Sequence, residues 1–183
     1  GTPVWPAETL RFDYNGFKLY TGTITRTGTG PNYTQFAFGS ATQIKPDSFK
    51  CKIEVASEDK LRLAGVKYPD KTRMGMFAVS CEFSIDWEDP AAGFSSADEI
   101  EAWLAGPNPR EINLFGLWDS GTQAGTGDNH SLNLDLPRMV LEGDLADYDL
   151  EKDPMASLKF NGLFDSTTTK YLFGLMLKNT ATA

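Results

Sequence analysis

The stretch from Phe77 to Trp87 alternates without an error between apolar and polar side chains. Its odd positions are all apolar, and its even positions are small or acidic: Ala78, Ser80, Glu82, Ser84 and Asp86. Successive side chains of a strand point to opposite faces, so this spacing predicts a long β-strand with one face in a core and the other in water. A helix would scatter the same apolar residues around its circumference. The rest of the chain must therefore supply partners for this strand.

The composition of the chain limits the kind of protein that can contain this long strand. The 183 residues fit one domain spanning 1–183, and 40% hydrophobic with 23% charged residues is typical of a globular protein. No window has the apolar length of a membrane helix, and residues 1–20 lack the basic start and apolar run of a signal peptide. We therefore expect neither a membrane partner nor export. The net charge of -8 argues against tight wrapping of nucleic acid, although it is equally explained by solubility alone.

Further apolar alternation predicts additional strands and turns. We expect strands within residues 10–14, 17–25, 33–38, 49–55, 61–65, 111–118, 132–141, 158–164 and 171–177. Turns or loops are expected at 15–16, 27–32, 57–60, 68–73, 119–129 and 165–169. The apolar phase slips by one residue at Pro137, which predicts a β-bulge there.

One segment has helical spacing instead. Ser96 precedes Glu99 at the capping-box interval, and apolar residues follow at helical spacing until Gly106. The sequence therefore predicts a mainly β fold, an antiparallel β-sandwich or barrel with one short flanking α-helix.

Cys51 and Cys81 are the only cysteines, and each lies on the apolar phase of a predicted strand. Two reduced core thiols are the favoured interpretation, because an unpaired cysteine behaves as a small hydrophobic residue. If their strands are neighbours, a disulfide becomes geometrically accessible, and the sequence leaves this open. With a single histidine, His130, a metal site is not expected.

Catalytic residues do not converge in the sequence. His130 has no nucleophile motif to serve, and the four aspartates between 144 and 153 lack the spacing of a calcium loop. Four tryptophans could stack on sugars, namely Trp5, Trp87, Trp103 and Trp118. Three of them are in phase with an apolar run, which favours core packing. We therefore expect no enzyme and no cofactor, and a binding or assembly role instead.

Three segments of the second half carry a family resemblance. They are 134–144 (Leu-Asp-Leu-Pro-Arg-Met-Val-Leu-Glu-Gly-Asp), 157–165 (Ser-Leu-Lys-Phe-Asn-Gly-Leu-Phe-Asp) and 171–179 (Tyr-Leu-Phe-Gly-Leu-Met-Leu-Lys-Asn). Together they resemble the closing strands of the major tail tube proteins of long-tailed, siphovirus-like bacteriophages. The order of a hairpin, a long alternating strand and one short helix is also similar, so that the resemblance covers about residues 45–179.

The resemblance implies a structural virion protein of the tail, made in the host cytoplasm. Such subunits assemble with themselves into rings, usually hexameric, which stack into a tube around a tape-measure protein. DNA later passes through the lumen without specific binding. The small and acidic face of the long strand would line that lumen through Ser80, Glu82, Ser84 and Asp86. Inter-ring contacts would come from three loops and involve Thr29, Asn32, Asp70, Arg73, Thr122 and Asp128.

Two other functions compete with a tube subunit. A carbohydrate- or receptor-binding β-sandwich would present Trp and Tyr side chains to water, and a glycosidase-like jelly roll would need a distinguishing pair of acids. A tube subunit instead needs exposed strand edges and a symmetric partner. Exposure of aromatic side chains therefore separates the first alternative from the assembly hypothesis.

Overall fold

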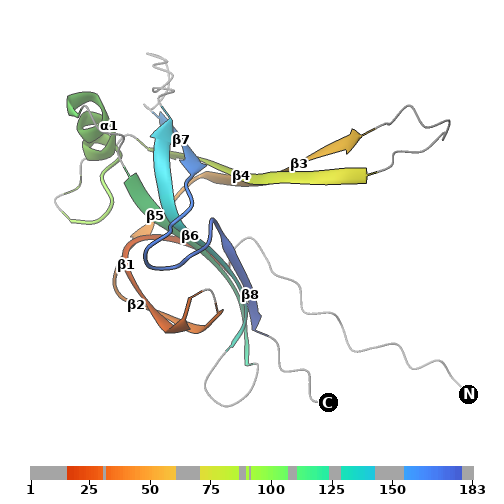
Figure 1. Ribbon diagram of the computed structural model, residues 1–183. Helices are drawn as coiled ribbons and strands as arrows, with labels where there is room; N and C mark the ends of the chain where they lie inside the picture. The colour runs from red at the N-terminus through yellow and green to blue at the C-terminus, as the bar shows by residue number, and fades with distance from the viewer. Residues whose placement is uncertain are drawn as a thin grey trace, which may run out of the picture.

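The computed structural model describes residues 16–30, 32–60, 71–86, 90, 92–106, 111–123, 129–142 and 155–178. Within them the chain is mainly β with one short helix, as predicted, and the described residues form eight strands (Figure 1). The strands are β1 (Phe17–Thr29), β2 (Asn32–Ile44), β3 (Ser48–Lys60), β4 (Lys71–Asp86), β5 (Glu111–Gln123), β6 (Asn129–Glu142), β7 (Met155–Gly162) and β8 (Gly174–Lys178). The helix α1 (Ser96–Ala105) lies between β4 and β5 in the sequence.

All strands join one antiparallel sheet in the order β2-β1-β5-β6-β7-β4-β3, with β8 paired to β6. The first half of β6 pairs with β8, and its second half pairs with β7 through residues 139–142. The predicted bulge at Pro137 is confirmed, because β6 has one more residue than β5 between the pairs Ile112↔Met139 and Leu114↔Leu136. Strand β6 is thus the centre of the body of the molecule.

The hairpin of β1 and β2 folds back over this body (Figure 1). Strand β1 pairs with β5 only as far as Tyr20, and then bends at Gly22, whose φ of 95° is unfavourable for other residues. The side-chain amide of Asn113 replaces the lost backbone pairing: it accepts from Gly22 N at 2.9 Å and donates to Gly22 O at 2.6 Å. The bend therefore leaves these polar groups of the backbone satisfied.

The main apolar core joins side chains of β1, β2, β4, α1, β5, β6 and β7. The largest fully buried side chains of the described residues are Phe83, Phe115 and Phe160. Phe83 of β4 stacks on Phe160 of β7 with ring centroids 5.6 Å apart, and Phe115 of β5 contacts the rings of Phe36 and Phe38 on β2. Aromatic side chains thus pack between β4 and β7 and, separately, between β5 and β2.

Several predicted boundaries are wrong. Several segments predicted as loops belong to strands. Residues 27–29 lie in β1, residue 32 in β2, residues 57–60 in β3 and residues 71–73 in β4. Residues 119–123 lie in β5, and residue 129 lies in β6. Cross-strand pairing extends regular structure through Gly, Thr and charged residues whose own preferences favour loops. The last strand begins at Gly174, not Tyr171, and the helix is capped by Ser95, whose Oγ accepts from Asp98 N at 3.0 Å. Residues 10–15, 61–70, 87 and 143–154, also named above, lie outside the described residues.

Candidate functional site

The four predicted lumen residues share the polar face of β4, opposite the core. Glu82 and Asp86 are exposed, and Ser80 and Ser84 are half-buried. The Oγ atoms of Ser84 and its β3 neighbour Ser48 lie 2.6 Å apart. Because Val79, Cys81, Phe83 and Ile85 are buried on the other side, the alternation predicted for this part of β4 is confirmed.

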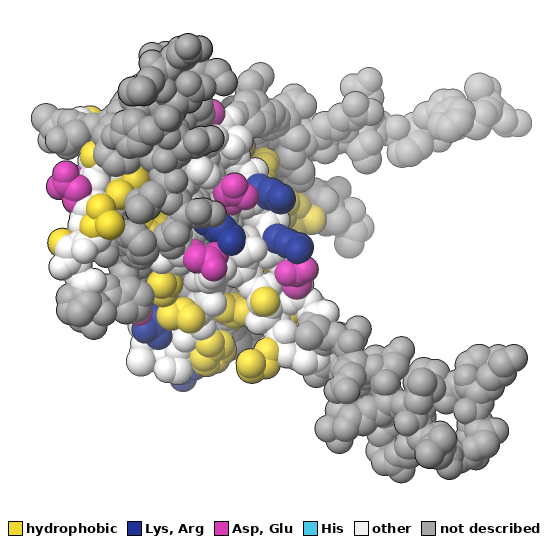
Figure 2. All heavy atoms as spheres, turned by 90° about the horizontal axis from the view of Figure 1, so that it is seen from above, with side chains coloured by type: hydrophobic (Ala, Val, Ile, Leu, Met, Phe, Trp, Pro, Cys, Tyr) yellow, Lys and Arg dark blue, Asp and Glu magenta, His cyan; other side chains and the backbone are white. Residues whose placement is uncertain are grey.

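Neighbouring strands add lysines to this polar face. Lys50 of β3 and Lys159 of β7 both stand opposite Glu82. The Lys52 ammonium lies 2.7 Å from a Glu54 carboxylate oxygen. Lys159 lies 2.8 Å from Glu142, and this hydrogen bond lowers the pKa of that carboxyl. Basic and acidic side chains are interleaved on one face in Figure 2. The face as a whole therefore carries mixed charge, whereas the row on β4 alone is acidic.

A two-stranded arm projects from the body beyond this face (Figure 1). We define the arm as residues 53–60 of β3 and 71–79 of β4, where β4 has β3 as its sole strand partner in the described sheet. The apolar row of β4 continues out of the core onto the arm. Its next member, Phe77, is 50% exposed, and Ile53 and Val55 on β3 are also exposed. The prediction that Phe77 lies in the core is therefore wrong, because the described core cluster ends at Val79 on this strand.

An apolar groove of about 720 Å³ lies at the root of the arm. Met76 and Phe77 form one wall, and residues 162–164 and 170–173 form the rest. The rings of Phe77 and Phe173 are 5.7 Å apart across it. Met76 is 89% exposed, and Leu163 and Phe164 are exposed as well. An open groove with this lining offers apolar contact to another molecule.

Strand β8 presents a second apolar surface. Leu175 is 59% exposed and Leu177 is equally exposed, while β6 is the only strand that pairs with β8 in the described part of the chain. An unpaired edge with exposed leucines is a template for another strand.

The predicted inter-ring residues are only partly described. Thr29 and Asn32 pair with each other at the tip of the β1–β2 hairpin, and both are exposed. Arg73 pairs with Glu58 in the arm, and Thr122 lies in β5. Asp70 and Asp128 lie outside the described residues. The structure thus places Thr29 and Asn32 together and leaves the grouping of the other four untested.

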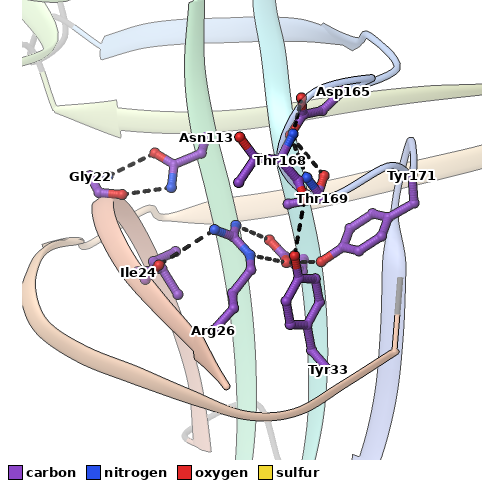
Figure 3. Close-up of polar contacts among 10 residues, drawn as sticks. Gly22, Ile24, Arg26, Tyr33, Asn113, Asp165, Thr168, Thr169 and Tyr171 are labelled. Carbon is purple, nitrogen blue, oxygen red and sulfur yellow. Dashed lines mark hydrogen bonds and ion pairs between the residues drawn. The ribbon is translucent and has the colours of Figure 1, made fainter. Parts of the chain in front are cut away.

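Behind these surfaces lies a buried ionic cluster that the sequence did not predict (Figure 3). Asp135 of β6, only 1% exposed, accepts two hydrogen bonds of 2.7 Å from the Arg26 guanidinium of β1, and Tyr171 donates a third. Burial alone would lower the pKa of Arg26, but Asp135 raises it. Burial and the bond to Asp135 raise the pKa of the Tyr171 phenol. The cluster fastens the hairpin to the sheet and to one wall of the groove.

A turn after β7 supports the same region. Asp165 accepts hydrogen bonds from the backbone N–H groups of Thr167, Thr168 and Thr169 and from two of their hydroxyls. The Tyr33 hydroxyl of β2 donates to Thr168 O at 3.2 Å, so the hairpin tip also rests on this turn. These local bonds hold the pKa of Asp165 below its usual range, although burial acts in the opposite direction.

The part of the chain that is described does not bring together the ligands of a metal site. No set of three His, Cys, Asp or Glu side chains there is placed to hold a metal ion. Nor does any described helix have the length and hydropathy that crossing a membrane requires. Among the tryptophans, Trp118 packs against the core, and the side chains of the other three are not described.

No protein-family model matches the chain, and no curated protein matches it in sequence.

Proposed function

We propose that this chain is a structural protein whose copies assemble into rings and stack into a tube, as the resemblance to phage tail tube proteins implies. The observation that carries the proposal is the apolar stripe that leaves the core and continues onto the projecting arm. Phe77, Ile53 and Val55 lie exposed on a two-stranded element that projects from the body. Burial of such a stripe against a second copy would remove this apolar area from water.

Exposed strand edges and the groove supply complementary surfaces. The leucines of β8 and the groove at the root of the arm are both apolar. A closed ring pairs every edge of its subunits and leaves no edge for uncontrolled growth. Among the side chains that the structure describes, the exposed aromatic residues are Phe77 and Phe164, whereas a sugar-binding platform would use exposed Trp and Tyr.

The polar face of β4 suits the wall of a DNA conduit. Its own row is small and acidic, and the lysines beside it include Lys52 and Lys159, which are held against carboxylates. Such a face offers phosphate few unneutralised cations, so DNA could pass without lasting contact. A tape-measure protein would occupy the same lumen before DNA does.

Assembly is tested with purified protein over a concentration series, by light scattering and electron microscopy of the same samples. Wild-type protein is expected to form rings or tubes with a central hole. Phe77→Ser combined with Leu175→Ser should shift the protein to monomer, because both side chains are lost from apolar contact surfaces. Leu104→Ser is the matched control, since Leu104 of α1 is 62% exposed and lies outside these surfaces. Equal assembly of the double variant and wild type would contradict the proposal.

A further inference from the structure

The two cysteines face each other across the root of the arm. Cys51 of β3 is directly opposite Cys81 of β4, and both are reduced thiols in this structure. Directly opposite residues of an antiparallel pair have Cα atoms about 4.5–5.5 Å apart, which is inside the range of about 4.4–6.8 Å that disulfides span. Their side chains share one face of the sheet. The backbone therefore already has the spacing that a bridge requires.

The two thiols differ in accessibility and in acidity. Cys81 is buried, whereas Cys51 is half-buried. The hydrogen bond between them lowers the pKa of the Cys51 thiol and raises that of Cys81, which burial raises further. Cys51 is thus the thiol that ionises first and that an oxidant reaches first, and Cys81 is held beside it as the second thiol.

We propose that Cys51 and Cys81 form a reversible cross-strand disulfide, made by a hydroperoxide, which fastens the root of the arm to the body. The Cys51 thiolate attacks the peroxide oxygen and becomes a sulfenic acid, while the other oxygen leaves as hydroxide and takes up a proton to form water. The Cys81 sulfur then attacks the Cys51 sulfur, the S–O bond breaks, and the hydroxyl leaves with the Cys81 proton as a second water. The two thiols lose two electrons in total, and one peroxide gains them.

The position of this bond between β3 and β4 determines its effect on the arm. Lys52 and Ser80 pair next to the cysteines, and β4 pairs with β7 from Ser80 onward but not along the arm. A bridge at this point therefore joins β3, an edge strand, to the β4 segment that is anchored on both sides. The bond closes the loop that contains the whole arm, so it restricts the unfolded chain and limits separation of the two strands. This inference does not depend on the proposed assembly.

Intact mass spectrometry tests the bond directly. Reduced wild-type protein, freed of reductant and treated with hydrogen peroxide, is expected to lose about 2 Da, the two thiol hydrogens, and to regain them with dithiothreitol. Proteolysis without reductant should give one peptide pair that contains residues 51 and 81. In Cys81→Ser protein the reaction should stop at a Cys51 sulfenic acid, about 16 Da heavier and trapped by dimedone.

Other outcomes overturn the inference. They are added oxygen on the wild-type protein without loss of the two hydrogens, bridges between two chains, or thiols that do not react in the folded protein. These readings use wild-type protein, so they remain decisive if Cys81→Ser fails to fold. Oxidation should also raise the midpoint of thermal unfolding by about 5–10 °C. Cys51→Ser should show no such rise, and a bridge that leaves the wild-type midpoint unchanged would contradict the fastening role.

Discussion

The body and the arm share the same apolar alternation but differ in how deeply it is buried. Phe83 and Phe77 stand on the same face of β4, three alternations apart, yet Phe83 is fully buried and Phe77 is half exposed. Around Phe83 the sheet has β7 on one side and β3 on the other, with the core above it. Around Phe77 only β3 remains as a strand partner in the described sheet. An apolar side chain stabilises the fold where the body encloses it and leaves apolar area in water where it does not.

Two ion pairs of the same geometry also differ in how deeply they are buried. The Arg26–Asp135 pair and the Arg138–Glu111 pair both join a guanidinium to a carboxylate through two hydrogen bonds of 2.6–2.8 Å. Side-chain exposure is 14% and 1% in the first pair, but 42% and 38% in the second. Equal geometry therefore does not imply an equal contribution to stability. The buried pair matters because leaving one charge alone in the interior is costly, whereas water replaces a lost partner at the surface.

The largest expected loss of stability comes from truncating the buried phenylalanine of β4, compared with the exposed one. Phe83→Ala should lower the free energy of unfolding by about 3–5 kcal/mol, because it leaves a cavity in the aromatic core. Phe77→Ala should lower it by about 1 kcal/mol or less, since half of that side chain is already in water. Denaturant titration of the two variants measures both losses. Comparable losses would show that the arm belongs to the core after all.

The ion pairs give the next largest effect. Arg26→Ala should lower the free energy of unfolding by about 3 kcal/mol, because Asp135 then keeps its buried charge with Tyr171 as its remaining partner in the cluster. Arg138→Ala, the matched control, should leave the unfolding midpoint unchanged within error. Both are measured by denaturant titration at neutral pH.

A third variant separates charge burial from lost packing. Adding Asp135→Asn to Arg26→Ala removes the stranded charge while keeping an oxygen for the Tyr171 hydroxyl. The double variant should recover part of the stability lost by Arg26→Ala. No recovery would mean that the arginine acts through its packing alone.

Alternation in the sequence predicted which side chains share a face, but not how far the body extends. The buried row from Val79 to Ile85 and the bulge at Pro137 follow from local spacing alone. Exposure of Phe77 depends instead on where β7 stops pairing with β4, at Ser80. Likewise, the sequence shows the acidic row of β4, whereas Lys50 and Lys159 join that face through the registers of β3 and β7.

The ionic cluster could not be predicted for a similar reason. Asp135 lies between Leu134 and Leu136, so that alternation assigns it to a solvent face. Its partner Arg26 is 109 residues away and reaches it only because β1 bends at Gly22 and returns over the sheet. A contact between residues so far apart in the chain leaves no local pattern in the sequence. An aspartate on the predicted solvent face needs no partner, so the sequence did not indicate that a cation would be required.

The smallest expected effect lies at the boundary of the two regions, in the turn that carries Asp165. Its carboxylate accepts hydrogen bonds from residues 167–169, and the same turn leads to Lys170 and Tyr171 in the groove. Asp165→Asn should lower the free energy of unfolding by about 1–2 kcal/mol at pH 7, because it weakens charge-assisted bonds.

The pH dependence of that loss distinguishes charge from shape. The folded pKa of Asp165 is below the value of about 3.9 expected in the unfolded chain, so its contribution is complete above that value and fades as pH falls toward the folded pKa. The difference between wild type and Asp165→Asn should therefore shrink between pH 5 and pH 2, measured by urea titration at each pH. Ser166→Ala, at an exposed position of the same turn, should show no such trend. A difference that is constant with pH would mean that the turn is held by its shape, and the groove wall would then depend on the body's packing instead of on this charge.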